Sequence, residues 1–430
     1  MRILMVVHKF PPESLGGTEI HSESLARELA VRHEVTIFYR QYVNTTQEAA
    51  AIQSSTDLRL APVRVQATAR LSTLIGEFWY SFRNKAIERR FGALLEEVRP
   101  DIVHVQHVMG LSAELIPIAK KYGLPVVLTL HDYWYMCAKS QLIRPDEQVC
   151  EMVDTGPDCV LCAAARVGLS ALRWVTPLAT WPFFYRRRVM HRALQFVDRF
   201  IAPSQFLITK YIAHGLPRDK IVYIENGIRL PTALPNDMSR RNDRLCFAYL
   251  GAIAPQKGVH ILIEAFNGLS PDSAELRIYG DLETFPDYVA KLRRDCRNPS
   301  VHFLGSVPHD RVLETIARAD ALIVPSLWFE NSPLVIQEAA AVRVPVIASR
   351  NGALAEKVQE GKNGFLFTVG DPLALRAIIQ TIVENPVQLE WVRAHIEPPK
   401  SIAETATQVE AVYWEALAVN RLEPAEPDSR

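Results

Sequence analysis

The residues best suited to chemistry lie in the stretch 330–338, which reads ENSPLVIQE. Ser332 is a good N-cap and Pro333 is tolerated at a first helical position, so the pattern predicts a helix that begins at Pro333. The next amides, those of Leu334 and Val335, would have no acceptor inside the helix and would attract a phosphate. The stretch therefore predicts an anion-binding site at a helix start.

The same stretch carries two carboxylates with seven residues between them. Glu330 precedes the expected helix and Glu338 lies inside it, so the two side chains do not share one helical face. They are better suited to two parts of one ligand, such as a sugar and a ribose, than to a joint acid/base pair. Taken alone, the stretch favours the plainer interpretation of a capped helix with two solvated glutamates.

A lysine lies in the loop after another apolar run. Gly251 ends that run, and Lys257-Gly258 follow within the loop. A lysine beside a glycine at the end of a strand can reach a diphosphate as a compact point charge. A solvated loop lysine is the alternative, so the motif has meaning only together with its neighbours.

Glycines and a histidine follow apolar runs in the first half of the chain. Gly16-Gly17 precede an expected helix, where they would let the backbone approach an anionic ligand; a plain glycine turn fits equally well. His131-Asp132 end a strand, where the histidine could hydrogen-bond a sugar hydroxyl or simply close a turn. Asn226-Gly227 is first of all a turn signal.

The composition excludes several classes of protein. The 430 residues carry 48 basic and 48 acidic side chains, a balance that argues against a protein that wraps nucleic acid. Gly-x-Gly-x-x-Gly is absent from both halves, so a nicotinamide-dependent dehydrogenase is not expected. No apolar run suits a signal peptide or a membrane span, and six cysteines fit a reducing compartment. We therefore expect a cytoplasmic protein.

Short runs that are apolar throughout alternate with helix-length amphipathic stretches. The apolar runs are 2–7, 34–39, 101–105, 125–130, 200–202, 244–250, 275–279, 301–303, 321–325 and 344–348. The helical stretches include 19–31, 84–98, 259–267, 286–296, 310–318 and 333–341. Strands that are apolar on both faces belong to parallel sheets covered by helices. We expect an α/β protein of two Rossmann-like, doubly wound domains with a cleft between them.

The boundaries follow from breaks in this alternation. The expected parts are an amino-terminal domain over 1–230 with a cysteine-containing insertion at 133–165, a linker over 231–243, a carboxyl-terminal domain over 244–401, a terminal helix over 402–422 that packs back, and a tail over 423–430.

These motifs occur together in an order typical of one family. The residues that carry the resemblance are Gly16-Gly17-Thr18-Glu19, His131-Asp132, Asn226-Gly227, Gly251, Lys257-Gly258, Tyr279-Gly280-Asp281, the stretch 330–338, Asn351-Gly352 and Glu356. Through them the chain resembles, over nearly its whole length, the retaining family 4 glycosyltransferases of the GT-B fold. The spaced pair of glutamates is the most specific of these motifs.

The resemblance implies different tasks for the two domains. The amino-terminal domain would bind a surface glycan or lipid-linked acceptor, and the carboxyl-terminal domain a nucleotide-diphosphate sugar. Among the catalytic residues, Lys257 would neutralise the diphosphate, Glu330 would hold the sugar and His131 would touch it. The implied donor-binding residues are Gly16, Gly17, Asn226, Gly251, Tyr279, Val307, Ser332, Pro333, Leu334, Val335 and Glu338, the last of these on the ribose. Transfer would retain the anomeric configuration without a metal cofactor, and the chain has no Asp-x-Asp motif.

One position departs from the family's pattern. Many members have an arginine just after the glycine of the lysine loop, where this chain has Ala252. The second cation on the diphosphate is then missing or is supplied by another residue, with Arg277 and Arg350 as candidates. Two other functions stay open: a nucleotide-sugar epimerase of the same architecture, and a protein that binds nucleotide sugar or glycan without turnover.

Four cysteines fall in the insertion after His131. Cys159 and Cys162 form a C-x-x-C pair of the kind that binds zinc, while Cys137 and Cys150 are spaced too widely for the standard pattern. A structural zinc site and four thiols are both compatible with this spacing.

Segment 166–199 carries seven arginines against one acid, Asp198, with aromatic residues between them. Cations beside aromatic side chains suit contact with an anionic membrane surface, which would help an enzyme with a lipid-linked acceptor. A helical hairpin packed on the amino-terminal domain, with a solvated arginine face, is the alternative.

Overall fold

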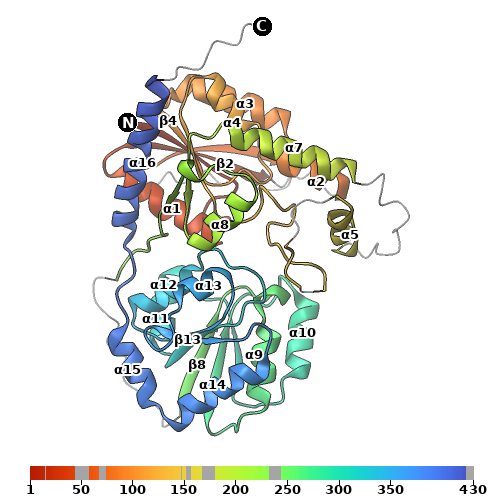
Figure 1. Ribbon diagram of the computed structural model, residues 1–430, viewed down its shortest axis with the longest axis vertical. Helices are drawn as coiled ribbons and strands as arrows, with labels where there is room; N and C mark the ends of the chain where they lie inside the picture. The colour runs from red at the N-terminus through yellow and green to blue at the C-terminus, as the bar shows by residue number, and fades with distance from the viewer. Residues whose placement is uncertain are drawn as a thin grey trace. The chain divides into compact units, whose positions relative to one another are not determined.

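The computed structural model describes residues 1–14, 16–43, 58–66, 74–146, 148–151, 156–166, 180–231 and 244–422 (Figure 1). The chain divides into two compact units. Unit 1 comprises Met1–Ser140, Met152–Gly227 and Ser401–Arg430; unit 2 comprises Gln141–Glu151 and Ile228–Lys400. Of the expected linker only Pro231 is described, and the expected tail 423–430 lies outside the described residues.

Unit 1 is built on a sheet of seven parallel strands in the order β3-β2-β1-β4-β5-β6-β7. The strands are β1 (Arg2–Val7), β2 (Glu34–Val43), β3 (Arg59–Gln66), β4 (Ile102–Val105), β5 (Val126–Thr129), β6 (Arg199–Ala202) and β7 (Ile221–Tyr223). Every residue of β4 and β5 is buried, as a sheet covered on both faces requires. The strand order reverses between β1 and β4, and the carboxyl ends of these strands are where such sheets bind ligands.

Local signals explain where several helices of unit 1 begin. Its helices are α1 (Gly17–Ala30), α2 (Leu74–Phe82), α3 (Lys85–Val98), α4 (Leu115–Lys121), α5 (Pro157–Arg166), α7 (Trp181–Gln195), α8 (Gln205–Ala213) and α16 (Ile402–Leu422). The side chains of Asn84 and Ser204 accept backbone amides at the starts of α3 and α8. The final helix, α16, lies against α1 (Figure 1), and its Val409 and Tyr413 join the core that contains β1.

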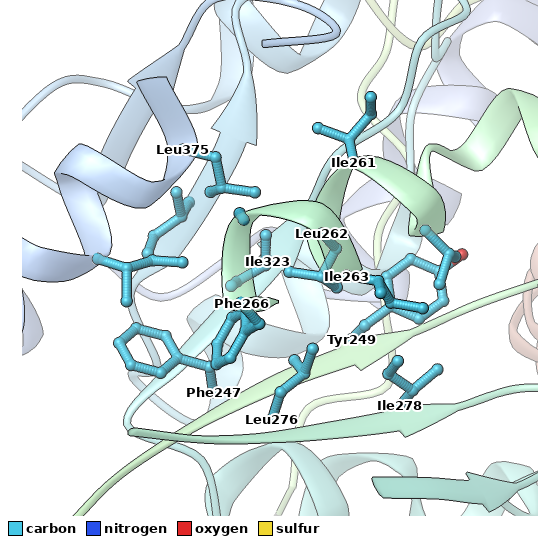
Figure 2. Close-up of a cluster of buried hydrophobic side chains, with 14 of the residues drawn as sticks. Phe247, Tyr249, Ile261, Leu262, Ile263, Phe266, Leu276, Ile278, Ile323 and Leu375 are labelled. Atoms are coloured by element: carbon cyan, nitrogen blue, oxygen red, sulfur yellow. The ribbon is translucent and has the colours of Figure 1, made fainter. Parts of the chain in front are cut away.

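Unit 2 repeats the plan with six parallel strands in the order β10-β9-β8-β11-β12-β13. The strands are β8 (Leu245–Leu250), β9 (Ala274–Tyr279), β10 (Val301–Gly305), β11 (Ala321–Val324), β12 (Val346–Ser349) and β13 (Gly364–Phe367). The helices are α9 (Val259–Asn267), α10 (Pro286–Asp295), α11 (Val312–Ala317), α12 (Leu334–Ala341), α13 (Gly352–Lys357), α14 (Pro372–Glu384) and α15 (Val387–His395). Figure 2 shows how α9 closes this core: Leu262 and Phe266 pack on Phe247 and Leu276 of the sheet.

Residues 141–151 group with unit 2, although the segments on both sides of them group with unit 1. Ile143 pairs with Val149 in an antiparallel bridge. Its side chain is buried in the same core cluster as Phe247 and Leu276. An apolar side chain therefore anchors the middle of the cysteine-containing insertion in unit 2.

The α/β fold of two Rossmann-like units is confirmed, and each of the ten expected strands coincides with an observed one. The sequence analysis missed β3, β7 and β13, which are all edge strands. β3 contains Pro62, and the other two are too short to show a clear period. A strand with only one neighbour needs fewer apolar residues, so its sequence signal is weaker.

Candidate functional site

Lys257 and Glu330 form a partly buried ion pair in unit 2. The Nζ atom of Lys257 lies 2.7 Å from Oε1 of Glu330. The same oxygen accepts hydrogen bonds from the Ser326 hydroxyl at 2.6 Å and from the Trp328 indole at 2.8 Å. The Lys257 ammonium also lies 5.1 Å from the centre of the Trp328 ring. Three donors therefore hold the Glu330 carboxylate in one orientation.

Backbone geometry explains how two residues so far apart in the sequence meet. Lys257 ends a 3-10 turn, and Gly258 follows with a φ of 71°. A Cβ atom at position 258 would overlap the carbonyl oxygen of Pro325, so only glycine lets the two loops approach so closely. The amide of Leu327 donates to the carbonyl of Gln256 at 2.9 Å and joins the loops a second time.

The structure corrects the expected start of the helix after Glu330. α12 begins at Leu334, and Pro333 is its N-cap, with a ψ of 114°, rather than its first helical residue. Ser332 is therefore one position too early to cap the helix, and its buried hydroxyl has no hydrogen-bond partner among the described residues. Leu334 and Val335 occupy the first two helical positions, whose amides have no acceptor within the helix.

Glu338 lies inside α12 with 9% of its surface exposed. Burial raises the pKa of this carboxyl to about 7, with no charged or hydrogen-bonding neighbour offsetting it in the described ranges. A buried carboxylate without a partner is unfavourable, so this position suits a ligand that brings its own hydroxyl donors.

Three of the residues implied to bind the donor lie together in unit 2. Tyr279, Val307 and Val335 are partly buried against one core cluster. Gly251 donates its amide to the carbonyl of Tyr279 at 3.1 Å, and its own carbonyl leaves no room for a Cβ at Gly280. The carboxyl end of β9 and the loop after β8 are therefore packed tightly against each other.

Arg277 and Arg350 were the candidates to replace the arginine that many family members have at the position of Ala252. The ion pairs of both lie away from the Lys257 loop. The Arg277 guanidinium binds Glu275 at 2.7 Å in the middle of β9. Arg350 lies 3.4 Å from Glu360 at an exposed site. Both arginines have carboxylate partners of their own, which argues against either as the second cation.

In unit 1, His131 follows β5 as expected. Its Nε2 lies 2.6 Å from Oε1 of Gln106, a residue just after β4. Burial lowers the pKa of His131 well below its usual value, and the nearby His21, His107 and His104 act in the same direction. The imidazole is therefore neutral near pH 7.

Gly16 and Gly17 are exposed at the start of α1, where Gly16 is the N-cap. A Cβ atom on Gly16 would overlap the carboxylate of Glu19. That carboxylate accepts a hydrogen bond from Ser14 at 2.8 Å and lies 3.3 Å from Nε2 of His8. The glycine thus gives room to an internal carboxylate at the helix start, a role the sequence did not reveal.

Asn226 and Gly227 lie at the end of the second segment of unit 1. Asn226 is buried, and a Cβ on Gly227 would overlap the backbone of Ser401 just before α16. The turn that Asn226-Gly227 predicted therefore lies where two chain segments approach each other closely. His21 also hydrogen-bonds the backbone of Gly227.

Four further histidines near the carboxyl ends of β1 and β4 were missed by the sequence analysis. They are His8, His21, His104 and His107, each with at most 7% of its residue surface exposed. The sequence His104-Val105-Gln106-His107 was the available signal, because it puts polar side chains where an apolar strand ends. Burial lowers the pKa of His21 to about 4 and that of His104 to about 3.

A zinc site at the four cysteines is not shown by the described residues. Cys159 and Cys162 lie on α5, while Cys150 belongs to the segment that groups with unit 2. Within the ranges given above, no group of three or more His, Cys, Asp or Glu side chains could hold a metal ion. Cys137 follows the loop after β5, with no such group around it.

The arrangement of two Rossmann-like units with parallel sheets defines the GT-B class of glycosyltransferases, and solved structures with this fold match nearly the whole chain. Sucrose-phosphate synthase from Thermosynechococcus elongatus matches with a TM-score of 0.71 and 20% identity, over 97% of this chain and 99% of that one. Anabaena Alr3699/HepE, solved in complex with UDP and glucose, matches with a TM-score of 0.66 and 20% identity, over 95% of this chain and 98% of that one.

Two family models match the chain: Glycosyltransferase Family 4 over residues 15–230 and Glycosyl transferases group 1 over residues 233–408. The chain belongs to this glycosyltransferase family. It is 25% identical to a glycogen synthase of Mycobacterium tuberculosis, over 90% of this chain and 87% of that protein. It is 24% identical to an MMP alpha-(1->4)-mannosyltransferase of Mycolicibacterium hassiacum, over 97% of this chain and 99% of that protein. The expected family and glycosyltransferase activity are confirmed.

Proposed function

We propose that this glycosyltransferase moves a hexose or similar sugar from a nucleotide-diphosphate sugar to a hydroxyl of a surface glycan or glycolipid, with retention of the anomeric configuration. The observation that carries the proposal is the Lys257–Glu330 pair beside the start of α12, with the partnerless Glu338 inside the same helix. The structure of Anabaena Alr3699/HepE with UDP and glucose supports a donor of this chemistry.

The donor diphosphate would bind Lys257 and the first amides of α12. A lysine ammonium has three donor protons and needs one for Glu330, so the others can reach phosphate oxygens. Leu334 and Val335 supply amides at the positive end of the helix dipole. Donors already in place where charge develops on the leaving diphosphate stabilise the transition state. No metal cofactor is part of this proposal.

The two glutamates would bind different hydroxyls of the donor. All three hydrogen bonds to Glu330 end on Oε1, which leaves Oε2 for hydroxyls of the transferred sugar. Glu338 would accept from the ribose, whose adjacent hydroxyls supply the partners that this buried carboxylate lacks. His131 would contact the sugar from unit 1, and Tyr279 with Val307 would line the base pocket.

A panel of nucleotides and nucleotide sugars tests this function by thermal stabilisation. A ligand at one hundred times its dissociation constant should add about 2.7 kcal/mol. We expect one nucleotide to act selectively, and its effect to disappear in Lys257→Ala and in Glu338→Ala. Lys291→Ala, an exposed lysine of α10, is the matched control and should retain the effect. Stabilisation by no member of the panel would contradict the proposal.

Product analysis separates the remaining alternatives. The anomeric proton coupling of the product reports retention, and an inverted product would contradict that part of the proposal. A changed nucleotide sugar formed without acceptor would instead indicate an epimerase. Selective binding without transfer to any hydroxyl acceptor would indicate a binding protein.

Helix α7 supports a further part of the proposal, namely peripheral contact with an anionic membrane that holds a lipid-linked acceptor. Its exposed face carries Trp181, Phe184, Arg187, Arg188 and Arg192 and no acidic residue. Arg186, in contrast, is buried and donates to the carbonyl of Trp134. Part of the basic segment, 167–179, lies outside the described residues. Among the helices that the structure describes, none is long and apolar enough to cross a membrane.

Vesicle co-sedimentation tests this contact. Binding to vesicles that contain phosphatidylglycerol should be lost when Arg187, Arg188 and Arg192 are changed to Gln together, because the surface cations attract anionic headgroups. Neutral phosphatidylcholine vesicles should not bind. Arg293→Gln with Arg294→Gln on α10 is the control, since it removes exposed cations elsewhere. Undiminished binding of the α7 variant would contradict the contact.

A further inference from the structure

A line of hydrogen bonds leads from His131 to the helix at the end of the chain. Nε2 of His131 lies 2.6 Å from Oε1 of Gln106, and Nε2 of Gln106 lies 3.2 and 3.3 Å from the ring nitrogens of His104. Nδ1 of His104 lies 2.6 Å from the hydroxyl of Tyr413 in α16, and its Nε2 lies 2.7 Å from the hydroxyl of Thr129. The line joins the ends of β4 and β5 to a residue 309 positions away from His104.

The first bond determines which nitrogen of His131 carries its proton. An amide oxygen can only accept, so His131 donates to Gln106 from Nε2. In the neutral ring Nδ1 then has a lone pair and no proton. This tautomer can accept a hydrogen bond from a sugar hydroxyl, whereas the other tautomer would have to donate at that position.

The far end of the line determines which way the Gln106 amide points. Both nitrogens of His104 face hydroxyl groups, and its ring meets the Tyr413 ring edge-on at 5.4 Å between centroids. His104 and Tyr413 are completely buried. Neutral His104 has one lone pair on its ring nitrogens, and Nε2 of Gln106 lies 3.3 and 3.2 Å from the two nitrogens. An NH2 group can share that lone pair with the facing hydroxyl, whereas an amide oxygen would be repelled by it, so the oxygen of Gln106 faces His131. A flipped amide would present donors to His131 and would force the other tautomer.

We propose that Tyr413 is a positioning residue of the glycosyltransferase: acting through His104 and Gln106, it fixes His131 in the orientation and tautomer that accept a hydroxyl of the transferred sugar. The inference rests on the role of His131 given under the proposed function. It makes the last helix of the chain a functional part of unit 1, in addition to its packing on α1.

Nitrogen NMR of the full-length protein labelled at histidine tests the tautomer without any need for turnover. The His131 signals, identified by their loss in His131→Asn, should show a proton on Nε2 and none on Nδ1. The Gln106→Met variant should give a mixture of tautomers, and Tyr413→Phe a smaller change in the same direction. A proton on Nδ1 in the unaltered protein, or signals unchanged in both variants, would overturn the proposal.

Kinetics test the consequence for catalysis, measured as release of nucleoside diphosphate from the nucleotide sugar that the enzyme turns over. A misplacement of about 1 Å at the reacting groups can cost about 100-fold in rate, so we expect Gln106→Met to lower activity about 10- to 100-fold. Tyr413→Phe should lower kcat about 3- to 10-fold with the donor KM unchanged, since misalignment affects the transition state most. In a His131→Asn background Tyr413→Phe should have no further effect on kcat.

A structural role of Tyr413 would give a different result. Glu410→Gln, one turn away on α16, breaks the contacts of Glu410 with Arg32 and His33. It should lower Tm and leave kcat unchanged. An equal fold-loss from Tyr413→Phe with and without His131 would overturn the proposal. If no nucleotide sugar were turned over, the proposed function would fail, and the NMR comparison would still decide the role of Tyr413.

Discussion

The two units of this glycosyltransferase place different chemistry at the ends of their sheets. Unit 2 holds a charged pair, Lys257 with Glu330, and a lone carboxylate, Glu338. Unit 1 holds buried histidines whose pKa values are lowered, among them His21 and His104, so these imidazoles are neutral near pH 7. The Lys257 ammonium suits the anionic part of a donor, whereas carboxylates and fixed neutral groups suit the hydroxyls of a sugar or an acceptor. This division follows from desolvation. A cation that leaves water loses its hydration, and an anionic ligand compensates that loss best.

The comparison is sharpest in acid, where we expect unit 1 to lose stability first. Burial lowers the pKa of His21 to about 4 and that of His104 to about 3 in the folded state, against 6.5 for the ordinary side chain. Between pH 7 and 5 the unfolded chain therefore binds protons that the folded chain does not, and the free energy of unfolding falls as the pH falls. Each of the two residues should remove about 2 kcal/mol at pH 5.

Hydrogen exchange at pH 7 and 5, corrected for the intrinsic rate, measures this loss unit by unit. Peptides from α1 and β4 should lose protection before peptides from β8 and β11. The buried Glu338 reinforces the contrast, because its raised pKa favours the folded state of unit 2 in acid. Equal losses of hydrogen-exchange protection in both units would contradict the expected difference between them.

Removal of the cation should have the largest effect on the chemistry of unit 2. Lys257→Ala should lower kcat about 10²- to 10³-fold, the usual result of losing one preorganised group that stabilises the leaving charge. Steady-state kinetics with the selected nucleotide sugar measures it, with Lys291→Ala as the control. A loss below tenfold would show that the amides of α12 or another cation carry this role instead.

The close approach that brings Lys257 to Glu330 should depend on Gly258. Gly258→Ala puts a Cβ on the carbonyl of Pro325 in a backbone conformation of positive φ, and should cost about 3 kcal/mol. Gly361 has the same φ of 71°, and an added Cβ there would meet no neighbouring atom. Gly361→Ala should therefore lower the free energy of unfolding by about 1 kcal/mol. Urea unfolding measures both. Equal losses would mean that strain alone, and not the approach of the loops, makes glycine necessary.

One substitution in unit 2 is expected to increase stability. A folded pKa of Glu338 raised to about 7 means that the folded chain holds a proton that the unfolded chain loses above pH 4.5. Its contribution to stability is therefore present in acid and is lost as the pH rises toward 7. Glu338→Gln should raise the free energy of unfolding at pH 8 by up to about 3 kcal/mol.

The same variant should change little at pH 4 and should lose the stabilisation by nucleotide. Urea unfolding at the two pH values, with and without nucleotide, measures these effects. A variant that is less stable than the original protein at pH 8 would show that the carboxylate has a partner in unit 2, and the contrast between the units would weaken.

Much of this organisation could be predicted from sequence because it depends on local patterns. Apolar runs predicted ten of the strands, and the resemblance carried by the motifs in their order, with Glu330 and Glu338 as the most specific pair, indicated the family. The helix start was wrong by one residue, because Pro333 keeps an extended backbone that the propensity of Ser332 as a cap does not take into account. The zinc interpretation stays a prediction, because a C-x-x-C spacing supplies two ligands and the described residues show no group of three or more.

The sequence by itself determined the alternation of strands and helices, the two-unit plan and the glycosyltransferase motifs, since each depends on neighbours within a few residues. The tertiary structure alone decided that Lys257 pairs with Glu330, 73 positions away, and that Tyr413 reaches His104 across 309 positions. It also left Glu338 buried with no partner among the described residues. Contacts of this kind arise from the packing of distant segments, and no local pattern encodes which polar groups will share one buried space.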